Sequence, residues 1–313
     1  MRCARHWIPD STLFAVRLLL ISDALQRGGD GSFALHPALA ESGRTLAKRR
    51  RRWFSCTDNN PLGWYAALVG SSPAALLAAG CPHLPVAARQ GWVASPFHAM
   101  PGRDSVRLLP ESDLPWDGHD ADWLCAELNP LLMQEGMALH ACGAALLLTC
   151  EHPIEAEPAA FAAIAGGLLP DRHPAGPDGG RLMRLLAEIQ MSLHASGQPT
   201  RAGKPAVNGL WLWGACTLPK GLAANLPAVA AADPYLQALH HSQGANLAIC
   251  EAVRLSALQL QDGLPGNVVL AGADHAVLLR PSSMPNWSKG WQPKSSLGED
   301  RLIARLREMI DAF

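Results

Sequence analysis

Three polar residues, spaced seven residues apart, could together hold an anionic ligand. They are His194, Arg201 and Asn208, and Gly214 follows them at the end of an apolar run. An arginine binds a phosphate or carboxylate with two parallel hydrogen bonds, a histidine donates one, and an asparagine donates or accepts. A glycine turn would let backbone amides approach the same anion. The structural alternatives are a helix cap for His194, a solvated loop residue for Arg201 and a turn former for Asn208.

Three further residues follow predicted strands and carry side chains that bind divalent metal ions. Asp23 comes directly after the apolar run 13–22, and Asp274 and His275 come shortly after the last apolar strand. A two-metal phosphoryl-transfer site uses such carboxylates and imidazoles, together with a serine or threonine nucleophile. The next acidic residue after Asp23 is as far away as Asp30. Each of these residues could instead be a polar residue that caps a helix at a strand end. The metal site and the helix cap therefore both remain open.

The segment 204–214, KPAVNGLWLWG, is the most distinctive stretch of the chain. Its alternating tryptophans and leucines predict a short buried strand with Trp211 and Trp213 on one face. An Asn-Gly turn signal precedes the strand, and Gly214 is expected to end it. Open α/β sheets bind ligands at such strand ends. Core packing is the expected role of the tryptophans, and a platform for ligand stacking is the alternative.

Composition defines a globular protein without a strong electrostatic preference. The 313 residues are 49% apolar and 17% charged, and the formal net charge is -1. This balance gives no overall attraction to nucleic acid or to an anionic membrane, so we expect neither as a partner. The basic run 48–52 is expected to be the solvated end of a helix. No run of about 18 apolar residues is present, which argues against a membrane-spanning helix.

Cysteine usage and the N-terminal sequence predict a cytoplasmic protein. The eight cysteines are scattered and form no C-x-x-C pair, which is typical of reduced thiols. The N-terminal apolar run is interrupted by Arg17 and is followed by no small-x-small cleavage site. We therefore expect no signal peptide.

Hydrophobic periodicity and turn signals predict alternating strands and helices. Strands are expected over 13–22, 91–97, 105–109, 137–140, 144–149, 210–214 and 267–271. Helices are expected over 37–54, 61–69, 73–79, 181–193, 233–241, 247–260 and 299–310, and over 120–135 with Asp120 as the N-cap. The pattern predicts an α/β fold, with a mostly parallel sheet flanked by helices and an antiparallel hairpin near the middle.

Domain organisation follows from the same pass along the chain. Residues 1–90 are expected to form the N-terminal part of the α/β domain, and 91–180 an inserted α+β lobe that contains the hairpin. Residues 181–313 are expected to complete the α/β domain and to include the tryptophan strand.

The region 181–219 resembles the RpfE-type family of bacterial regulatory proteins. The family has a helix that ends in E-x-Q-M-x-L-H, a loop with Arg and Gly, a strand close to P-x-V-N-S-L-W-L-W-G-G-G, and a Leu-Pro soon after. This chain has the corresponding residues Glu188, Gln190, Met191, Leu193, His194, Arg201, Gly203, Pro205, Val207, Asn208, Leu210 to Gly214, Leu218 and Pro219. A weaker resemblance extends over 91–149.

The same helix–loop–strand pattern is similar to part of the archaeal-type cofactor-independent phosphoglycerate mutases. Those enzymes belong to the alkaline-phosphatase-like superfamily, which uses two metal ions and a serine nucleophile. The resemblance therefore implies a degenerate alkaline-phosphatase-like domain. It also implies manganese or zinc if the chain is an enzyme, and otherwise no cofactor.

Two departures from the family pattern argue against an intact active site. The loop before the tryptophan strand lacks the family's second histidine, and the triple glycine after it is reduced to Gly214-Ala215-Cys216. We therefore expect a non-enzymatic protein that has a regulatory role or binds a protein partner. The alternatives are a metal-dependent phosphoglycerate mutase and a sensor that binds a small phosphorylated metabolite through His194 and Arg201.

Overall fold

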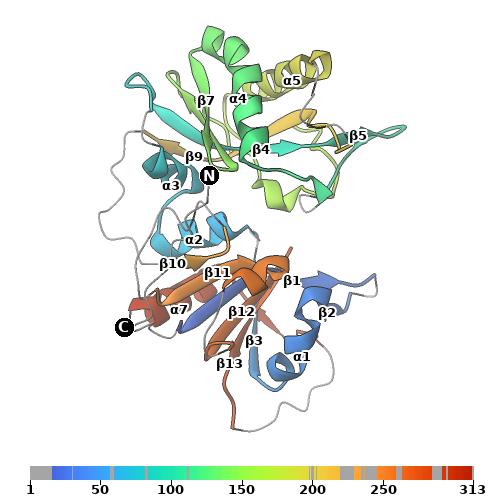
Figure 1. Cartoon of the computed structure of the whole chain (residues 1–313), viewed down its shortest axis with the longest axis vertical. Helices are drawn as coiled ribbons and strands as arrows, with labels where there is room; N and C mark the ends of the chain where they lie inside the picture. The colour runs from blue at the N-terminus through green and yellow to red at the C-terminus, as the bar shows by residue number, and fades with distance from the viewer. Residues whose placement is uncertain are drawn as a thin grey trace, which may run out of the picture.

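The protein folds into two lobes, which lie one above the other in Figure 1. The structure is a computed structural model. It describes residues 16–29, 31–56, 60–81, 84–110, 113–196, 198, 201, 203–218, 229–233, 236, 245–258, 263–283, 291–293 and 295–311.

An eight-stranded sheet forms the centre of the lower lobe, in the order β10-β11-β1-β12-β13-β3-β14 with β2 paired to β1. Its strands are β1 (Leu18–Arg27), β2 (Phe33–Leu35), β3 (Arg50–Ser55), β10 (Val229–Ala231), β11 (Leu247–Glu251), β12 (Asn267–Gly272), β13 (His275–Arg280) and β14 (Ser296–Leu297). The neighbours β10, β11, β1 and β12 run parallel, whereas β13 pairs antiparallel with both β12 and β3. The parallel strands are continuous apolar runs because both faces of the sheet are covered.

Helices cover both faces of this sheet. On one face, α2 (Pro61–Val69) and α7 (Glu299–Asp311) pack on one apolar cluster. On the other face lie the 3₁₀ helix η1 (Pro37–Leu39), α1 (Ala40–Ala47) and the 3₁₀ helix η6 (Ala252–Leu258). The lower lobe is therefore a three-layer α/β unit.

A four-stranded antiparallel sheet forms the upper lobe, in the order β7-β8-β4-β9. Its strands are β4 (Gln90–Phe97), β7 (Met137–Cys142), β8 (Ala145–Cys150) and β9 (Gly209–Thr217). The small hairpin β5 (Ala99–Pro101) and β6 (Val106–Leu108) lies beside it. The helical elements of this lobe are α3 (Pro73–Gly80), α4 (Gly118–Leu132), η3 (Met133–Glu135), η4 (Phe161–Ala163) and α5 (Gly179–Ala195).

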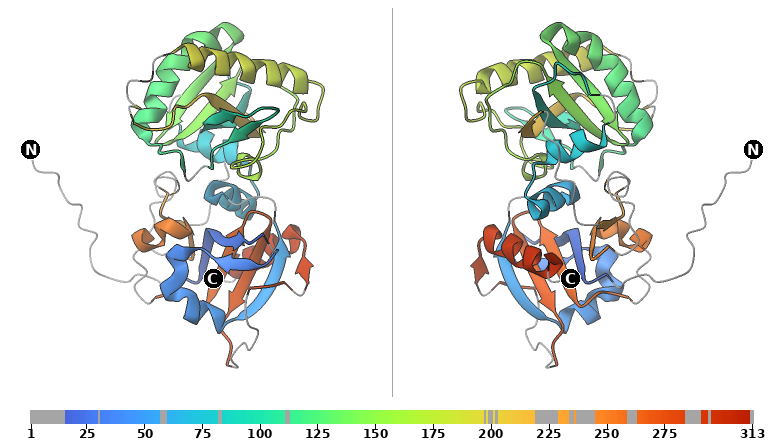
Figure 2. Two further views of the ribbon diagram at one scale, coloured as in Figure 1. Left: turned by 90° about the vertical axis from the view of Figure 1, so that its right-hand side faces the viewer. Right: turned by 90° about the vertical axis from the view of Figure 1, so that its left-hand side faces the viewer.

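The two lobes meet at the helices α2 and α3. These helices follow one another with a bend of 95° between them, and Figure 2 shows them between the two sheets. Leu62 of α2 packs against the cores of both lobes. In the part of the chain that the structure describes, no single helix is long and apolar enough to cross a membrane.

The predicted fold class is confirmed: the protein is α/β, with a mostly parallel central sheet flanked by helices and additional antiparallel sheets. The tryptophan strand, however, lies in the antiparallel sheet, where it is the edge strand beside β4, rather than in the larger sheet. Alternating side chains predict a strand equally well in either sheet, because they do not identify the neighbouring strand.

The predicted helix 37–54 is wrong in its second half. The helix α1 ends at Ala47, and the basic run continues as strand β3. The apolar residues Trp53 and Phe54 are buried on opposite faces of the sheet, which a strand achieves through its two-residue repeat. Tertiary burial of these two side chains overrides the helical preference of the preceding arginines.

Two other predicted helices also differ from the structure. The segment 247–260 begins as the parallel strand β11, because its apolar residues pair with β1 and β10, and continues as the 3₁₀ helix η6. The helix α4 has Asp117, not Asp120, as its N-cap: the Asp117 side chain accepts hydrogen bonds from His119 N and Asp120 N. Most of the predicted helix 233–241 lies outside the described residues.

Candidate functional site

A shallow hollow of about 460 Å³ opens on the upper lobe between α5 and the β5–β6 hairpin. The helix contributes Ala187, Gln190, Met191 and His194 to its wall. These positions are three and four residues apart, so the helical repeat places them on one side of α5. The opposite stripe of α5, which includes Ile189 and Leu193, is buried in the core. The amphipathic pattern of this helix therefore turns one side of it toward the hollow.

Asn208 forms another part of the wall and is held by backbone hydrogen bonds. Its Oδ1 accepts a hydrogen bond from Ala99 N at 2.6 Å, and its Nδ2 donates to Ala99 O at 2.8 Å. The side chain thus bonds β5 as a neighbouring strand would. Ala99 therefore uses one of its two N–H donors and one of the two acceptor positions on its oxygen, which fixes the side chain in the wall of the hollow.

Three exposed apolar side chains surround or line this hollow. They are Met191, which is 65% exposed, Pro101 of β5 and Ala187 of α5. Exposed apolar side chains that gather at one place mark binding surfaces more often than single scattered ones do. Methionine also adapts its shape to different partners. The hollow and these three side chains are called the α5 hollow below.

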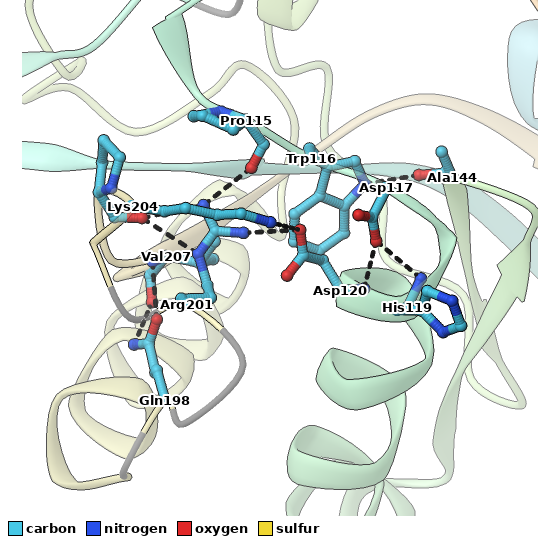
Figure 3. Close-up of polar contacts among 11 residues, drawn as sticks. Pro115, Trp116, Asp117, His119, Asp120, Ala144, Gln198, Arg201, Lys204 and Val207 are labelled. Atoms are coloured by element: carbon cyan, nitrogen blue, oxygen red, sulfur yellow. Dashed lines mark hydrogen bonds and ion pairs between the residues drawn. The ribbon is translucent and has the colours of Figure 1, made fainter.

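Arg201 does not join His194 and Asn208 in the hollow, which corrects the predicted three-residue anion site. Its side chain is buried and forms an ion pair with Asp120, with 2.9 Å between Nη1 and Oδ2. It also donates to Pro205 O and to Pro115 O, and Figure 3 shows the bond to Pro115. These partners use its donors inside the protein, so Arg201 holds the loop before β9 onto the start of α4.

Further local contacts surround this ion pair (Figure 3). Gln198 bonds both the N–H and the C=O of Val207, which closes the loop that carries Arg201. The Trp116 indole lies 5.8 Å from the Arg201 guanidinium and donates to Ala144 O. Sequence alone gave no signal for the ion pair, because Asp120 reads equally well as an ordinary helix cap.

The sequence predicted that Gly214 ends the strand. In the structure it lies within β9. Its φ of 61° is in the left-handed region, next to the irregular register between β4 and β9. An added Cβ would lie 3.3 Å from Cγ of Pro73, at the start of α3. The glycine therefore allows the strand to bend against α3, and the proline ring occupies the space where an anion would approach.

The predicted metal ligands lie at the carboxyl end of the parallel strands of the lower lobe. Asp274 forms an ion pair with Arg27 at 2.6 Å, and its second oxygen lies 3.0 Å from Nδ1 of His275. Among the described residues, no three His, Cys, Asp or Glu side chains gather where they could hold a metal ion. The side chains present at Asp23, Asp274 and His275 therefore do not fit a two-metal centre.

Asp23 stands out by its backbone. It is the only non-glycine residue with positive φ among the described residues, at 52°, and it lies where the register between β1 and β12 shifts. Such a conformation is uncommon outside glycine, although aspartate tolerates it better than most residues. The side chain is exposed in the middle of β1, next to the buried Ser22.

Glu251 is a further carboxylate at the carboxyl end of the parallel strands, and the sequence analysis did not identify it. Burial raises its pKa, the nearby Arg254 lowers it, and the charges of Asp23 and Asp233 raise it further. Arg254 Nε lies 3.2 Å from its Oε2. Sequence reasoning missed Glu251 because the prediction placed it in a helix, whereas it ends the parallel strand β11.

Comparisons with known proteins reveal distant structural similarity only. No protein-family model matches the sequence, and no curated protein matches it either. The chain is similar to the PH0037 protein from Pyrococcus horikoshii, with 10% identity, a TM-score of 0.45, and coverage of 96% of this chain and 99% of that one. It is also similar to the cofactor-independent phosphoglycerate mutase from Thermoplasma acidophilum, with 12% identity, a TM-score of 0.36, and coverage of 94% and 100%.

Proposed function

We propose that this chain is a non-enzymatic, partner-binding regulatory protein of the RpfE type, built on a phosphoglycerate-mutase-like scaffold. The observation that carries the proposal is the α5 hollow. Gln190, Met191 and His194 belong to the helix-end string that resembles the RpfE family, and all three line the hollow. The part of the sequence on which the resemblance rests thus coincides with an exposed, mainly apolar surface.

The chemistry of the α5 hollow favours a protein segment with apolar side chains as the partner. Burying Met191 and Pro101 would remove apolar surface from water, which stabilises a complex by about 25 cal/mol per Å². His194 and Gln190 add hydrogen-bonding groups at the margin of the surface. An apolar centre with a polar rim is the usual composition of a protein–protein interface.

Site-directed photo-crosslinking in the organism of origin tests this proposal. A photoreactive residue is placed at Met191, which is 65% exposed, and at Met133 as the control, which is 67% exposed and lies beyond α4. We expect one specific crosslinked protein from position 191 that is absent from position 133. Equal products at both positions, or no product at 191, would contradict the assignment of the surface.

The enzymatic alternative is a metal-dependent phosphoglycerate mutase or a related phosphoryl-transfer enzyme. It predicts turnover of 3-phosphoglycerate by purified protein in the presence of manganese or zinc. Turnover that is lost in Asp23→Asn but kept in Asp178→Asn, a substitution in the upper lobe, would overturn the non-enzymatic proposal. We expect no turnover in either the wild type or the variants.

The third proposal is a sensor of a small phosphorylated metabolite. It depends on the presence of His194 and Asn208 in one hollow. A thermal-shift titration with 3-phosphoglycerate, repeated with His194→Ala, tests it. A saturable rise in Tm that the substitution abolishes would favour the sensor over the partner-binding protein. The buried Arg201 is unsuitable as the test position, because its loss disturbs the fold.

The free thiols support a reducing compartment. Among the described residues, Cys142, Cys150 and Cys250 are buried thiols that form no disulfide. Buried free cysteines behave as small apolar side chains and are common where thiols stay reduced. We propose the cytoplasm on this basis.

A further inference from the structure

Four arginines gather on one face of the lower sheet, away from the α5 hollow. Arg50 of β3 pairs directly with Arg280 of β13, and Arg52 lies two residues further along β3, so it points to the same face. Phe54 continues this face and packs with Leu302 and Leu306 of α7. The fourth arginine, Arg305, comes from α7, which Figure 2 shows lying along the sheet.

The charges of the other three arginines act on Arg280. Burial lowers the pKa of Arg280, and the charges of Arg305, Arg52 and Arg50 lower it further. Like charges at directly opposed strand positions destabilise a sheet. The folded protein therefore retains an arrangement that is electrostatically unfavourable by itself.

No carboxylate compensates this charge within the described part of the chain. The ion pairs there involve other residues, and none includes any of these four arginines. The Nε atom of Arg305 is buried without a hydrogen-bond partner. Buried polar groups nearly always have partners, so this donor and the uncompensated charge point to an anionic ligand.

The arginines are also accessible from the sheet edge. The strand β14 pairs with β3 only at Trp53 and Phe54, beyond the arginines. Arg50 and Arg52 are exposed. Arg51, between them, points to the opposite face, where its guanidinium lies 4.0 Å from the ring centre of Trp291. One face of this strand end is thus occupied, and the other presents free guanidinium groups.

We propose that Arg50, Arg52, Arg280 and Arg305 form a binding site for a small polyphosphate, namely a ligand with two or three linked phosphate groups. Directly opposed strand residues have Cβ atoms about 5 Å apart, which suits adjacent phosphates of one molecule. Each guanidinium can donate two parallel hydrogen bonds to phosphate oxygens. A short linear polyphosphate supplies several negative charges within that space, whereas one phosphate would neutralise fewer of the arginines.

Calorimetric titration with inorganic tripolyphosphate tests the site. We expect saturable binding with one ligand per chain, weakened at least about tenfold in Arg280→Gln because charge-assisted hydrogen bonds are lost. Arg172→Gln is the matched control, since Arg172 is an exposed arginine of the upper lobe, and it should bind like the wild type. Arg280→Lys keeps the charge but loses the bidentate geometry, so its affinity should be intermediate.

The stability of the ligand-free variant provides a second measurement. Removing one of four mutually repelling charges should raise the Tm of Arg280→Gln at low salt, and added salt should reduce this gain. An unchanged affinity for tripolyphosphate in Arg280→Gln would overturn the site, as would no saturable binding by the wild type. Tighter binding of a single-stranded DNA oligonucleotide than of tripolyphosphate would overturn the assignment to a small ligand.

Discussion

At the scale of single residues, the buried ion pair of Asp120 and Arg201 links two segments that are distant in sequence. Both side chains are almost fully buried, and Lys204 lies further away, 3.7 Å from the same carboxylate oxygen. Replacing a whole buried pair by apolar residues is often harmless, whereas removing one partner leaves an uncompensated charge. The pair therefore chiefly fixes the loop before β9 to the start of α4. This ion pair is called the latch below.

The first prediction concerns this latch. Arg201→Ala should lower the free energy of unfolding by about 3–5 kcal/mol, because the Asp120 carboxylate is left buried and unpaired. Lys204→Ala is the control and should cost less than about 1 kcal/mol, since Lys204 is partly exposed and lies 3.7 Å from the carboxylate. Urea denaturation measures both. If the two variants lose similar stability, the latch is not the main role of Arg201.

The second prediction concerns thiol reactivity. A hydrogen bond from Cys142 lowers the pKa of Cys81, although burial opposes this effect. Burial raises the pKa of Cys125 and that of Cys150 to about 12. Because the thiolate is the reactive form, Cys81 should react with iodoacetamide faster than either of them.

Peptide mass spectrometry after brief labelling measures these rates. The variant Cys142→Ser should alter the rate at Cys81, because the partner of its hydrogen bond is changed, and should leave Cys150 unaffected. Faster labelling of Cys125 than of Cys81 would show that access, rather than the pKa, controls the reaction.

At the scale of elements, local sequence predicted a helix or strand correctly where its side-chain pattern is compatible with only one of the two. The helices α2, α3, α5 and α7 and the hairpin β7–β8 lie close to their predicted bounds. The strands β3 and β11 were read as helices, because their burial depends on strands that are distant in sequence. Pairing with strands that are distant in sequence determines the secondary structure of these two segments.

The candidate site was predictable to a similar extent. His194 ends α5 and Asn208 precedes β9, and these two elements pack together, so both residues reach the same hollow. Arg201 lies between them in sequence, yet its position is fixed by Asp120 from another helix. Short-range spacing could not reveal that partner.

The third prediction tests the bend in β9. Gly214→Ala should destabilise the protein by about 1–2 kcal/mol, since a side chain is unfavourable at positive φ, and the added carbon would also contact Pro73. Gly143→Ala is the control for the backbone effect alone, because its φ is 65° and nothing lies within 4 Å of the added Cβ. Thermal unfolding compares the two. Equal losses would show that contact with Pro73 is unimportant.

At the scale of the whole molecule, the lower lobe concentrates charge at both ends of its sheet. Glu251 ends β11, and Asp23 follows Ser22, the residue of β1 that lies opposite Glu251, while the opposite end of the sheet carries the four arginines. The small net charge of -1 therefore conceals an uneven distribution. Each end should respond differently to pH and salt.

The fourth prediction uses the acidic end. Because folding raises the pKa of Glu251 above its ordinary value of 4.5, the folded state binds its proton more tightly than the unfolded state does. The free energy of unfolding should therefore fall as pH rises from about 4.5 through the raised pKa. Glu251→Gln lacks this fall, so it should match the wild type near pH 4 and exceed its Tm at pH 8. A difference in Tm that does not change with pH would contradict the assignment.

The route of the chain between the lobes has a consequence for the molecule's modularity. The antiparallel sheet begins with β4 and finishes with β9, and these strands are direct neighbours, with Gln90 opposite Thr217. The polypeptide thus enters and leaves this sheet at adjacent points. Such a segment can be transplanted into a surface loop of another protein without stretching its host, since both of its ends arrive side by side.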